Sequence, residues 1–128
     1  MSDKFTVEII SPEQTILKQD TNEVIIPSFE GQMGILNNHI PLITFLRPGI
    51  ITIKAEGEKK YYAEEGTVEF SNNNLLILTS TAINIVHLDK SKINELLQKA
   101  ETNLNNQSTD KERYVASCKL ETLKEISQ

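Results

Sequence analysis

Several residue types that mark common classes of protein are scarce in this sequence. Its 128 residues include no tryptophan, 5% aromatic residues and one cysteine, Cys118, so no internal disulfide can form. The chain therefore lacks the disulfide framework of a small secreted domain, and we expect a reducing compartment. Acidic side chains outnumber basic ones by 18 to 13, and the net charge of -5 argues against nucleic acid as a partner.

Long hydrophobic runs are also missing. The longest, such as residues 75–78, fall far short of the roughly twenty residues that a membrane-spanning helix needs. The first residues are of mixed charge and lack the basic start and apolar stretch of a signal peptide. We therefore expect membrane association only through a partner.

Glycine and proline are absent from the last 62 residues of the chain, since all of them lie at or before residue 66. Residues 1–88 carry six basic and eleven acidic side chains, whereas residues 89–128 carry seven of each. The two parts thus differ in backbone chemistry and in charge, which predicts a first domain over 1–88 and a second over 89–128.

The first part has the pattern of a β-sandwich. Phe5, Val7 and Ile9 alternate with other residues at the period of two that is typical of a half-buried strand. Turn signals such as Pro48-Gly49 separate further short segments of this kind. The sequence predicts eight to ten short strands, hence an all-β sandwich or flattened barrel, with a loop over 29–39. The clearest segments are 5–10, 24–26, 40–46, 51–55, 60–63, 68–70, 75–78 and 83–86.

The second part has helical periodicity. Its first apolar stripe recurs at spacings of three and four residues, and consists of Ile93, Leu96, Leu97, Ala100 and Leu104. Asp89 or Ser91 is available as the N-cap. After an interruption at 105–108, Thr109 and Glu112 have the spacing of a capping box that starts a second helix. The sequence predicts an antiparallel helical hairpin, which is too short to be stable without a partner surface.

No constellation of residues indicates chemistry. Cys118 with His39 or His87 is a conceivable nucleophile and base, but no third group orients either histidine, so a packed thiol is the favoured interpretation. The two histidines and the carboxylates show no metal-ligand spacing. Gly31-x-x-Gly34 is too short for a phosphate-binding loop. We expect no catalytic residue, no metal and no cofactor.

A longer motif surrounds these two glycines. Residues 30–43 read EGQMGILNNHIPLI, followed by LRPG at 46–49, GTVEF at 66–70 and LTSTAI at 78–83. Their order and spacing resemble the epsilon subunit of F-type ATP synthase, whose signature is G-x-x-G-[IV]-[LY]-P-x-H-x-P-L. The resemblance extends from residue 4 to the C-terminus. Asn37 replaces the signature proline and Glu65 replaces a glycine.

The resemblance implies a non-catalytic rotor subunit of the central stalk, which couples ion-driven rotation of the c-ring to ATP synthesis. Its sandwich would bind the gamma subunit and rest on the polar loops of the c-ring. The implied location is peripheral, on the cytoplasmic side of the bacterial inner (plasma) membrane. By position, the contact with the c-ring or gamma would involve Glu30, Gly31, Gln32, Met33, Gly34 and His39.

The resemblance also implies that the helical hairpin is regulatory and reaches the catalytic beta and alpha subunits. The basic side chains in the matching positions are Lys111, Arg113, Lys119 and Lys124. Because acidic side chains are interspersed among them, we expect only modest inhibition of ATP hydrolysis. A weak nucleotide site at Asp89 and Lys92 is a further expectation, although lysine replaces the family's arginine and loses its planar fork.

One alternative from another class stays open at this point. A stand-alone cytosolic β-sandwich binding module with a helical dimerisation appendage would fit the same secondary structure, because sandwiches host many functions. The low aromatic content and the missing tryptophan argue against a carbohydrate- or peptide-binding module of this kind.

Overall fold

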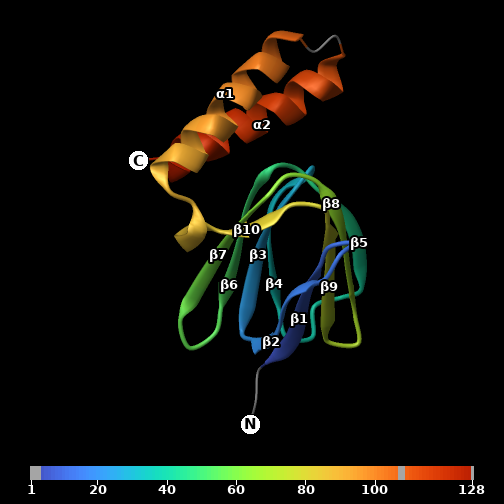
Figure 1. The fold of residues 1–128 in the computed structure, drawn as a ribbon. Helices are drawn as coiled ribbons and strands as arrows, with labels where there is room; N and C mark the ends of the chain where they lie inside the picture. The colour runs from blue at the N-terminus through green and yellow to red at the C-terminus, as the bar shows by residue number, and fades with distance from the viewer. Residues whose placement is uncertain (1–3, 107–108, 128) are drawn as a thin grey trace.

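The computed structural model describes residues 4–106 and 109–127, which form a ten-stranded sandwich followed by a helical hairpin (Figure 1). This confirms the fold class predicted from the sequence. The strands are β1 (Phe5–Ile10), β2 (Thr15–Thr21), β3 (Glu23–Ser28), β4 (Gly31–Leu36), β5 (Leu42–Leu46), β6 (Gly49–Lys54), β7 (Glu58–Ala63), β8 (Gly66–Ser71), β9 (Asn74–Thr79) and β10 (Ala82–Asn84).

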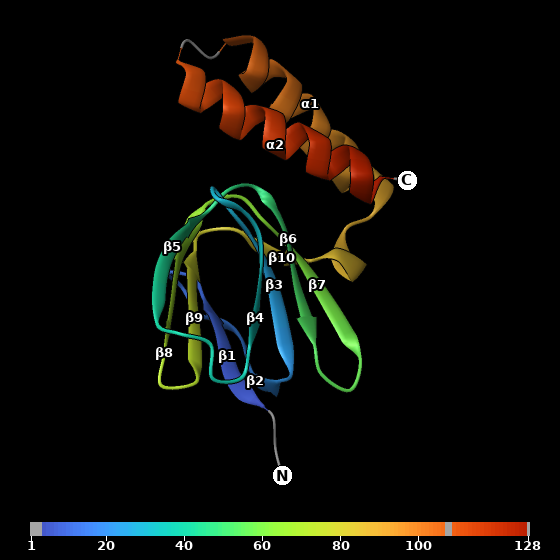
Figure 2. The same ribbon diagram turned by 180° about the vertical axis from the view of Figure 1, so that it is seen from behind.

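The strands form one ladder that folds over itself. Its order is β10-β7-β6-β3-β5-β8-β9-β1-β2, and β4 pairs with β3 off this path. A single residue pair, Ser28 with Leu46, joins β3 to β5, so the ladder bends there and its two halves face each other (Figures 1 and 2). β1 and β9 pair in parallel, and the other described pairs are antiparallel.

The core lies between the two halves and follows from the alternation of the strands. In β1 the predicted apolar positions are all buried, and Phe5 packs edge-on against Phe70 with 5.6 Å between ring centroids. Buried polar side chains are hydrogen-bonded: the Thr21 hydroxyl donates to the Lys54 carbonyl at 2.8 Å, and the Ser28 hydroxyl to the Gly31 carbonyl at 2.7 Å. The interior therefore pairs its polar groups as well as burying its apolar ones.

Three local expectations were wrong. The predicted loop over 29–39 contains strand β4, which pairs with β3 from Glu23 opposite Leu36 to Ser28 opposite Gly31. Its glycines and glutamine have little intrinsic strand preference, so pairing across the tight β3–β4 turn determines its conformation. Strand β2 was not predicted at all. The strand expected over 83–86 ends at Asn84, whose side chain accepts a hydrogen bond from the Val86 amide at 3.2 Å and starts a 3₁₀ turn over Ile85–His87.

The two helices start where the sequence predicts. Helix α1 (Lys90–Asn106) is capped by Asp89, which accepts from the Lys92 amide at 2.8 Å. Helix α2 (Asp110–Ile126) is capped by Thr109, whose hydroxyl accepts from the Glu112 amide at 3.1 Å and donates to Glu112 Oε1 at 2.9 Å. α1 extends beyond the expected interruption at 105, through Asn106, while residues 107–108 and the side chain of Leu104 lie outside the described part.

The hairpin packs across one end of the sandwich (Figures 1 and 2). A second apolar cluster joins the two parts, because Tyr62 of β7 packs with side chains from both helices. Its buried members are Tyr62, Leu88, Ile93, Ala100 and Leu123. Within the described residues, neither helix is long and apolar enough to span a membrane.

Candidate functional site

On the outer face of the β5-β8-β9-β1 layer, exposed apolar side chains gather on β5 and β9, and this part of the layer is called the apolar face below. Alternation along β5 turns Ile43 and Phe45 outward, where they are 75% and 60% exposed, and on β9 Leu78 is 44% exposed. The strand registers place Phe45 opposite Thr67, Thr67 opposite Leu78, and Leu78 opposite Ile10. Three of the four side chains in this row are apolar, so the face is suited to docking a protein surface.

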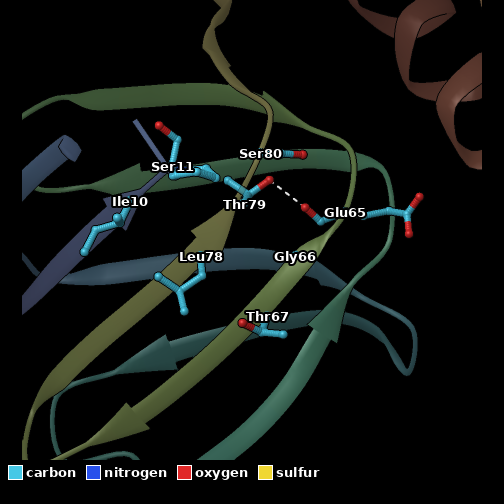
Figure 3. A pocket seen from close by; sticks show the side chains of 9 residues that line it. Ile10, Ser11, Glu65, Gly66, Thr67, Leu78, Thr79 and Ser80 are labelled. Carbon is cyan, nitrogen blue, oxygen red and sulfur yellow. Dashed lines mark hydrogen bonds between the residues drawn. The ribbon is translucent and has the colours of Figure 1, made fainter. Parts of the chain in front are cut away.

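A shallow hollow of about 460 Å³ lies beside this row (Figure 3). Gly66 is one of its lining residues and packs tightly against β9, where any Cβ would collide with the Leu78 carbonyl oxygen. The Thr79 hydroxyl donates to the Glu65 carbonyl at 2.6 Å and holds the turn before β8 against β9. The hollow brings no base and nucleophile together, and offers space for an apolar side chain of a partner.

Sequence reasoning did not identify this face. A signal for it was nevertheless present, because residues 42–46 and 75–78 are apolar on both faces of their strands. In a two-layered sandwich only one face of a strand meets the core, so a strand that is apolar on both faces requires a second covering surface. What could not be read from the sequence was the strand order that places β5 and β9 on either side of β8.

The residues predicted to contact the c-ring or gamma form a strip along β4. Glu30 lies in the β3–β4 turn, Gln32 and Gly34 point outward from β4, and His39 follows the strand. Gly31 has φ of 117°, which a glycine adopts freely, and the side chain of Met33 packs against the core. In the described structure β4 pairs with β3 alone, so its other edge is unpaired.

This strip is not a compact cluster. Six residues of strand span about 17 Å at about 3.3 Å per residue, and the loop that carries His39 lies at the end of the sandwich away from the helices (Figure 2). Its opposite end meets α2, where Phe29 packs against Tyr114 with 5.8 Å between centroids. The structure therefore arranges the predicted contact residues as an extended edge.

Two of the four basic side chains predicted to be regulatory face the sandwich. The Lys111 ammonium lies 5.9 Å from the centroid of the Phe29 ring, and Lys119 Nζ lies 3.8 Å from Glu64 Oε1. Arg113 and Lys124 are exposed. In this compact arrangement, Lys111 and Lys119 contact the chain's own sandwich.

A hydrogen bond followed by an ion pair connects the core to α2. The hydroxyl of buried Tyr62 donates to Glu64 Oε2 at 3.0 Å, while the other oxygen of Glu64 faces Lys119. Burial, and then the charge of Glu64, raises the pKa of Tyr62 far above its ordinary value. Beside these contacts, the Thr122 hydroxyl lies 3.5 Å from the Pro48 carbonyl and Cys118 Sγ lies 3.9 Å from Arg47 Nη1.

The remaining candidate residues are not brought together. Asp89 and Lys92 lie at the start of α1, and Arg113 lies in the first turn of α2, at the other end of the hairpin. Cys118 is buried against the sandwich, far from the loop of His39. Among the residues that the structure describes, no three metal-ligating side chains cluster.

The chain is similar to one family throughout its length. Residues 4–85 match the family described as ATP synthase, Delta/Epsilon chain, beta-sandwich domain. The ATP synthase epsilon chain of Pelagibacter ubique is 50% identical over 130 residues, covering 99% of this chain and 100% of its own. That of Afipia carboxidovorans is 31% identical over 125 residues, covering 97% and 92%.

Two solved structures share the fold. A chain in the Euglena gracilis mitochondrial ATP synthase, in an OSCP/F1/c-ring assembly, superposes with a TM-score of 0.75 at 21% identity, covering 97% of this chain and 79% of its own. A chain in the central stalk and c-ring of the Tetrahymena thermophila enzyme gives 0.71 at 16% identity, covering 96% of each.

Proposed function

Because the chain belongs to the family of ATP synthase epsilon chains, we propose that it is a non-catalytic rotor subunit of the central stalk. It couples ion-driven rotation of the c-ring to ATP synthesis by fixing the ring to the gamma subunit. The observation that carries this proposal is the apolar face of the sandwich, with Ile43, Phe45 and Leu78 exposed. Chemistry takes place elsewhere in the complex.

The gamma subunit covers the apolar face. Burying a large apolar side chain contributes about 1.5–3 kcal/mol, so covering the three exposed ones favours docking of a partner here, and the hollow beside Leu78 adds further apolar contact. A hydrogen-bonded sheet does not bend easily under load. Torque that enters at one surface of the sandwich is therefore transmitted to the other.

The c-ring occupies the β4 strip. Gln32 presents an amide, Gly34 leaves the backbone accessible, and His39 offers a ring nitrogen, a set that matches polar loops better than an apolar surface. The strip and the apolar face belong to different strands, so both partners can bind at once. An arginine at Gln32 would place a bulky charge in this contact and reduce coupling without unfolding the sandwich.

The hairpin, residues 89–128, regulates hydrolysis, while residues 1–88 carry the docking surfaces. In the compact state the sandwich engages Lys111 and Lys119, and release of the hairpin frees them for the catalytic beta and alpha subunits. Interspersed carboxylates weaken that attraction, so removal of residues 89–128 raises ATP hydrolysis only a few fold. A many-fold rise would show a stronger brake than we propose.

The location follows from the complex. The chain is held peripherally, on the cytoplasmic side of the bacterial inner membrane, through its contacts with gamma and the ring. Nucleotide binding at Asp89 and Lys92 contributes little, because the Asp89 carboxylate already caps α1.

Binding to the gamma subunit tests the proposal. With full-length chain and purified gamma, Phe45→Asp raises Kd by about 10- to 100-fold, the equivalent of losing one buried aromatic side chain. Val86→Asp is the matched control, because Val86 is also exposed and apolar but lies on the 3₁₀ turn outside the face. Equal affinity of the two variants would contradict gamma docking on this face, and self-association in place of gamma binding would favour a stand-alone module.

A further inference from the structure

Two asparagines join the loop after β4 to the turn between β8 and β9. The backbone amide of Asn38 donates to Asn73 Oδ1 at 2.8 Å, and Asn73 Nδ2 donates to Asn38 Oδ1 at 3.0 Å. The residues are far apart in the sequence, so these bonds link two separate segments at the end of the sandwich opposite the hairpin. A single amide side chain thus supplies both a donor and an acceptor to the same partner residue.

The backbone at both residues favours asparagine. Asn38 has φ of 65° and Asn73 has φ of 57°, in the left-handed region that asparagine tolerates better than most residues. The carbonyl of Asn73 also accepts from the Thr6 amide at 3.1 Å, which anchors the turn to the start of β1. The β8–β9 turn is therefore a fixed support rather than a free loop tip.

The loop is held on a second side by an aromatic contact. The His39 ring packs edge-on against Phe70 with 5.9 Å between centroids, and Phe70 is buried in the core against Phe5. The next residues, Ile40 and Pro41, have no such support and project into solvent. The loop over residues 37–41 thus exposes Ile40 and Pro41 beside residues that Asn73 and Phe70 contact.

We propose that Asn73 is a positioning residue, which holds the loop over 37–41 in the shape that docks on the c-ring. This rests on the proposed function, since it assumes that the loop carrying His39 contacts the ring. The position that the resembling signature gives to proline holds Asn37 here, and a proline would restrict the backbone by itself. The bonds between Asn38 and Asn73 supply that restriction from outside the loop.

The two hydrogen bonds between Asn38 and Asn73 are called the clamp below. Glycine substitutions distinguish the effect of losing the clamp from the effect of changing the β8–β9 turn. Asn73→Gly keeps the left-handed backbone and the carbonyl that accepts from Thr6, and removes only the amide side chain. Asn72→Gly is the matched control, because Asn72 is the neighbouring residue of the same turn, with φ of 51°, and the clamp does not use its side chain. Both variants change the unfolded chain equally.

Hydrogen exchange and coupling are measured in the ATP synthase assembled with the full-length chain. In Asn73→Gly the Asn38 amide exchanges about tenfold faster, the equivalent of ~1.4 kcal/mol, and proton pumping per ATP hydrolysed falls several fold. In Asn72→Gly both quantities stay at the wild-type level. Gamma affinity is unchanged in both variants, because the apolar face lies elsewhere, and this shows that the sandwich is folded.

Two results would overturn the inference about Asn73 and leave the proposed function standing. One is unaltered exchange at Asn38 in Asn73→Gly, and the other is faster exchange with wild-type coupling. Ile40→Asp distinguishes these from failure of the proposed function, since it places a charge at the docking tip itself. If Ile40→Asp abolishes coupling, the loop over 37–41 docks on the c-ring, and the result for Asn73→Gly then tests only the role of Asn73. If Ile40→Asp couples normally, the loop does not meet the ring and both proposals fall.

Discussion

Replacing Leu123 with alanine tests what holds the hairpin on the sandwich. Leu123 is 1% exposed and belongs to the cluster in which Tyr62 of the sandwich meets residues of both helices. Leucine-to-alanine changes in cores cost about 2–5 kcal/mol, and a site between two movable parts can partly close, so we expect about 2 kcal/mol. The ion pair between Lys119 and Glu64 is partly exposed and contributes at most about 1 kcal/mol. Apolar burial therefore stabilises docking more than this ion pair does.

Thiol labelling of Cys118 measures this docking directly. It is the single cysteine of the chain, it is 5% exposed, and it faces Arg47 of the sandwich, so it reacts when the hairpin lifts off. A loss of about 2 kcal/mol predicts labelling about 30-fold faster in Leu123→Ala at unchanged helical circular dichroism. Lys124→Ala, an exposed neighbour on α2, should label at the wild-type rate. Wild-type labelling in Leu123→Ala would refute the assignment of docking to this cluster.

Two further predictions concern Tyr62 and Asp89. The pKa of Tyr62 is raised in the folded protein, so its contribution to stability is complete below the unfolded value of about 10 and is lost as the pH rises beyond it. In thermal unfolding, the melting temperature of Tyr62→Phe should therefore rise relative to that of the wild type as the pH increases above about 10. A difference in melting temperature that stays constant across that pH range would contradict this prediction. Asp89→Ala should lower the unfolding free energy by about 1 kcal/mol with or without ATP, because the carboxylate caps α1, and calorimetric titration with ATP should show no binding heat. A strong heat that disappears in Asp89→Ala would instead establish a nucleotide site.

Local signals in the sequence predicted the elements whose conformation is determined locally. The alternation of β1 and the caps at Asp89 and Thr109 each depend on residues within four positions of one another, and the structure confirms all three. β4 depends instead on pairing with β3, and its glycines indicated a loop. The segment predicted over 24–26 is part of a longer strand, because β3 continues through Pro27, whose carbonyl accepts from the Arg47 amide at 2.9 Å.

The two proposed docking surfaces also differ in how far the sequence predicts them. The motif over 30–43 led to the β4 strip, whereas the apolar face depends on which strands lie side by side. Ile43 and Leu78 are far apart in the sequence, and their common outward orientation follows only from the registers of β5, β8 and β9. The clamp between Asn38 and Asn73 was equally hidden, since each asparagine by itself indicates only a turn.

The parallel pairing of β1 with β9 has a consequence for how the chain acquires its structure. Thr6 lies opposite Asn74 and Ile10 opposite Leu78, whereas β6–β7 and β8–β9 are hairpins of neighbouring strands. Closure of a long loop precedes the contacts that reward it, so we expect β1 to join β9 more slowly than either hairpin forms. During synthesis the first strand can therefore pair with β9 only after residue 78 has been made, long after the partners of a local hairpin are available.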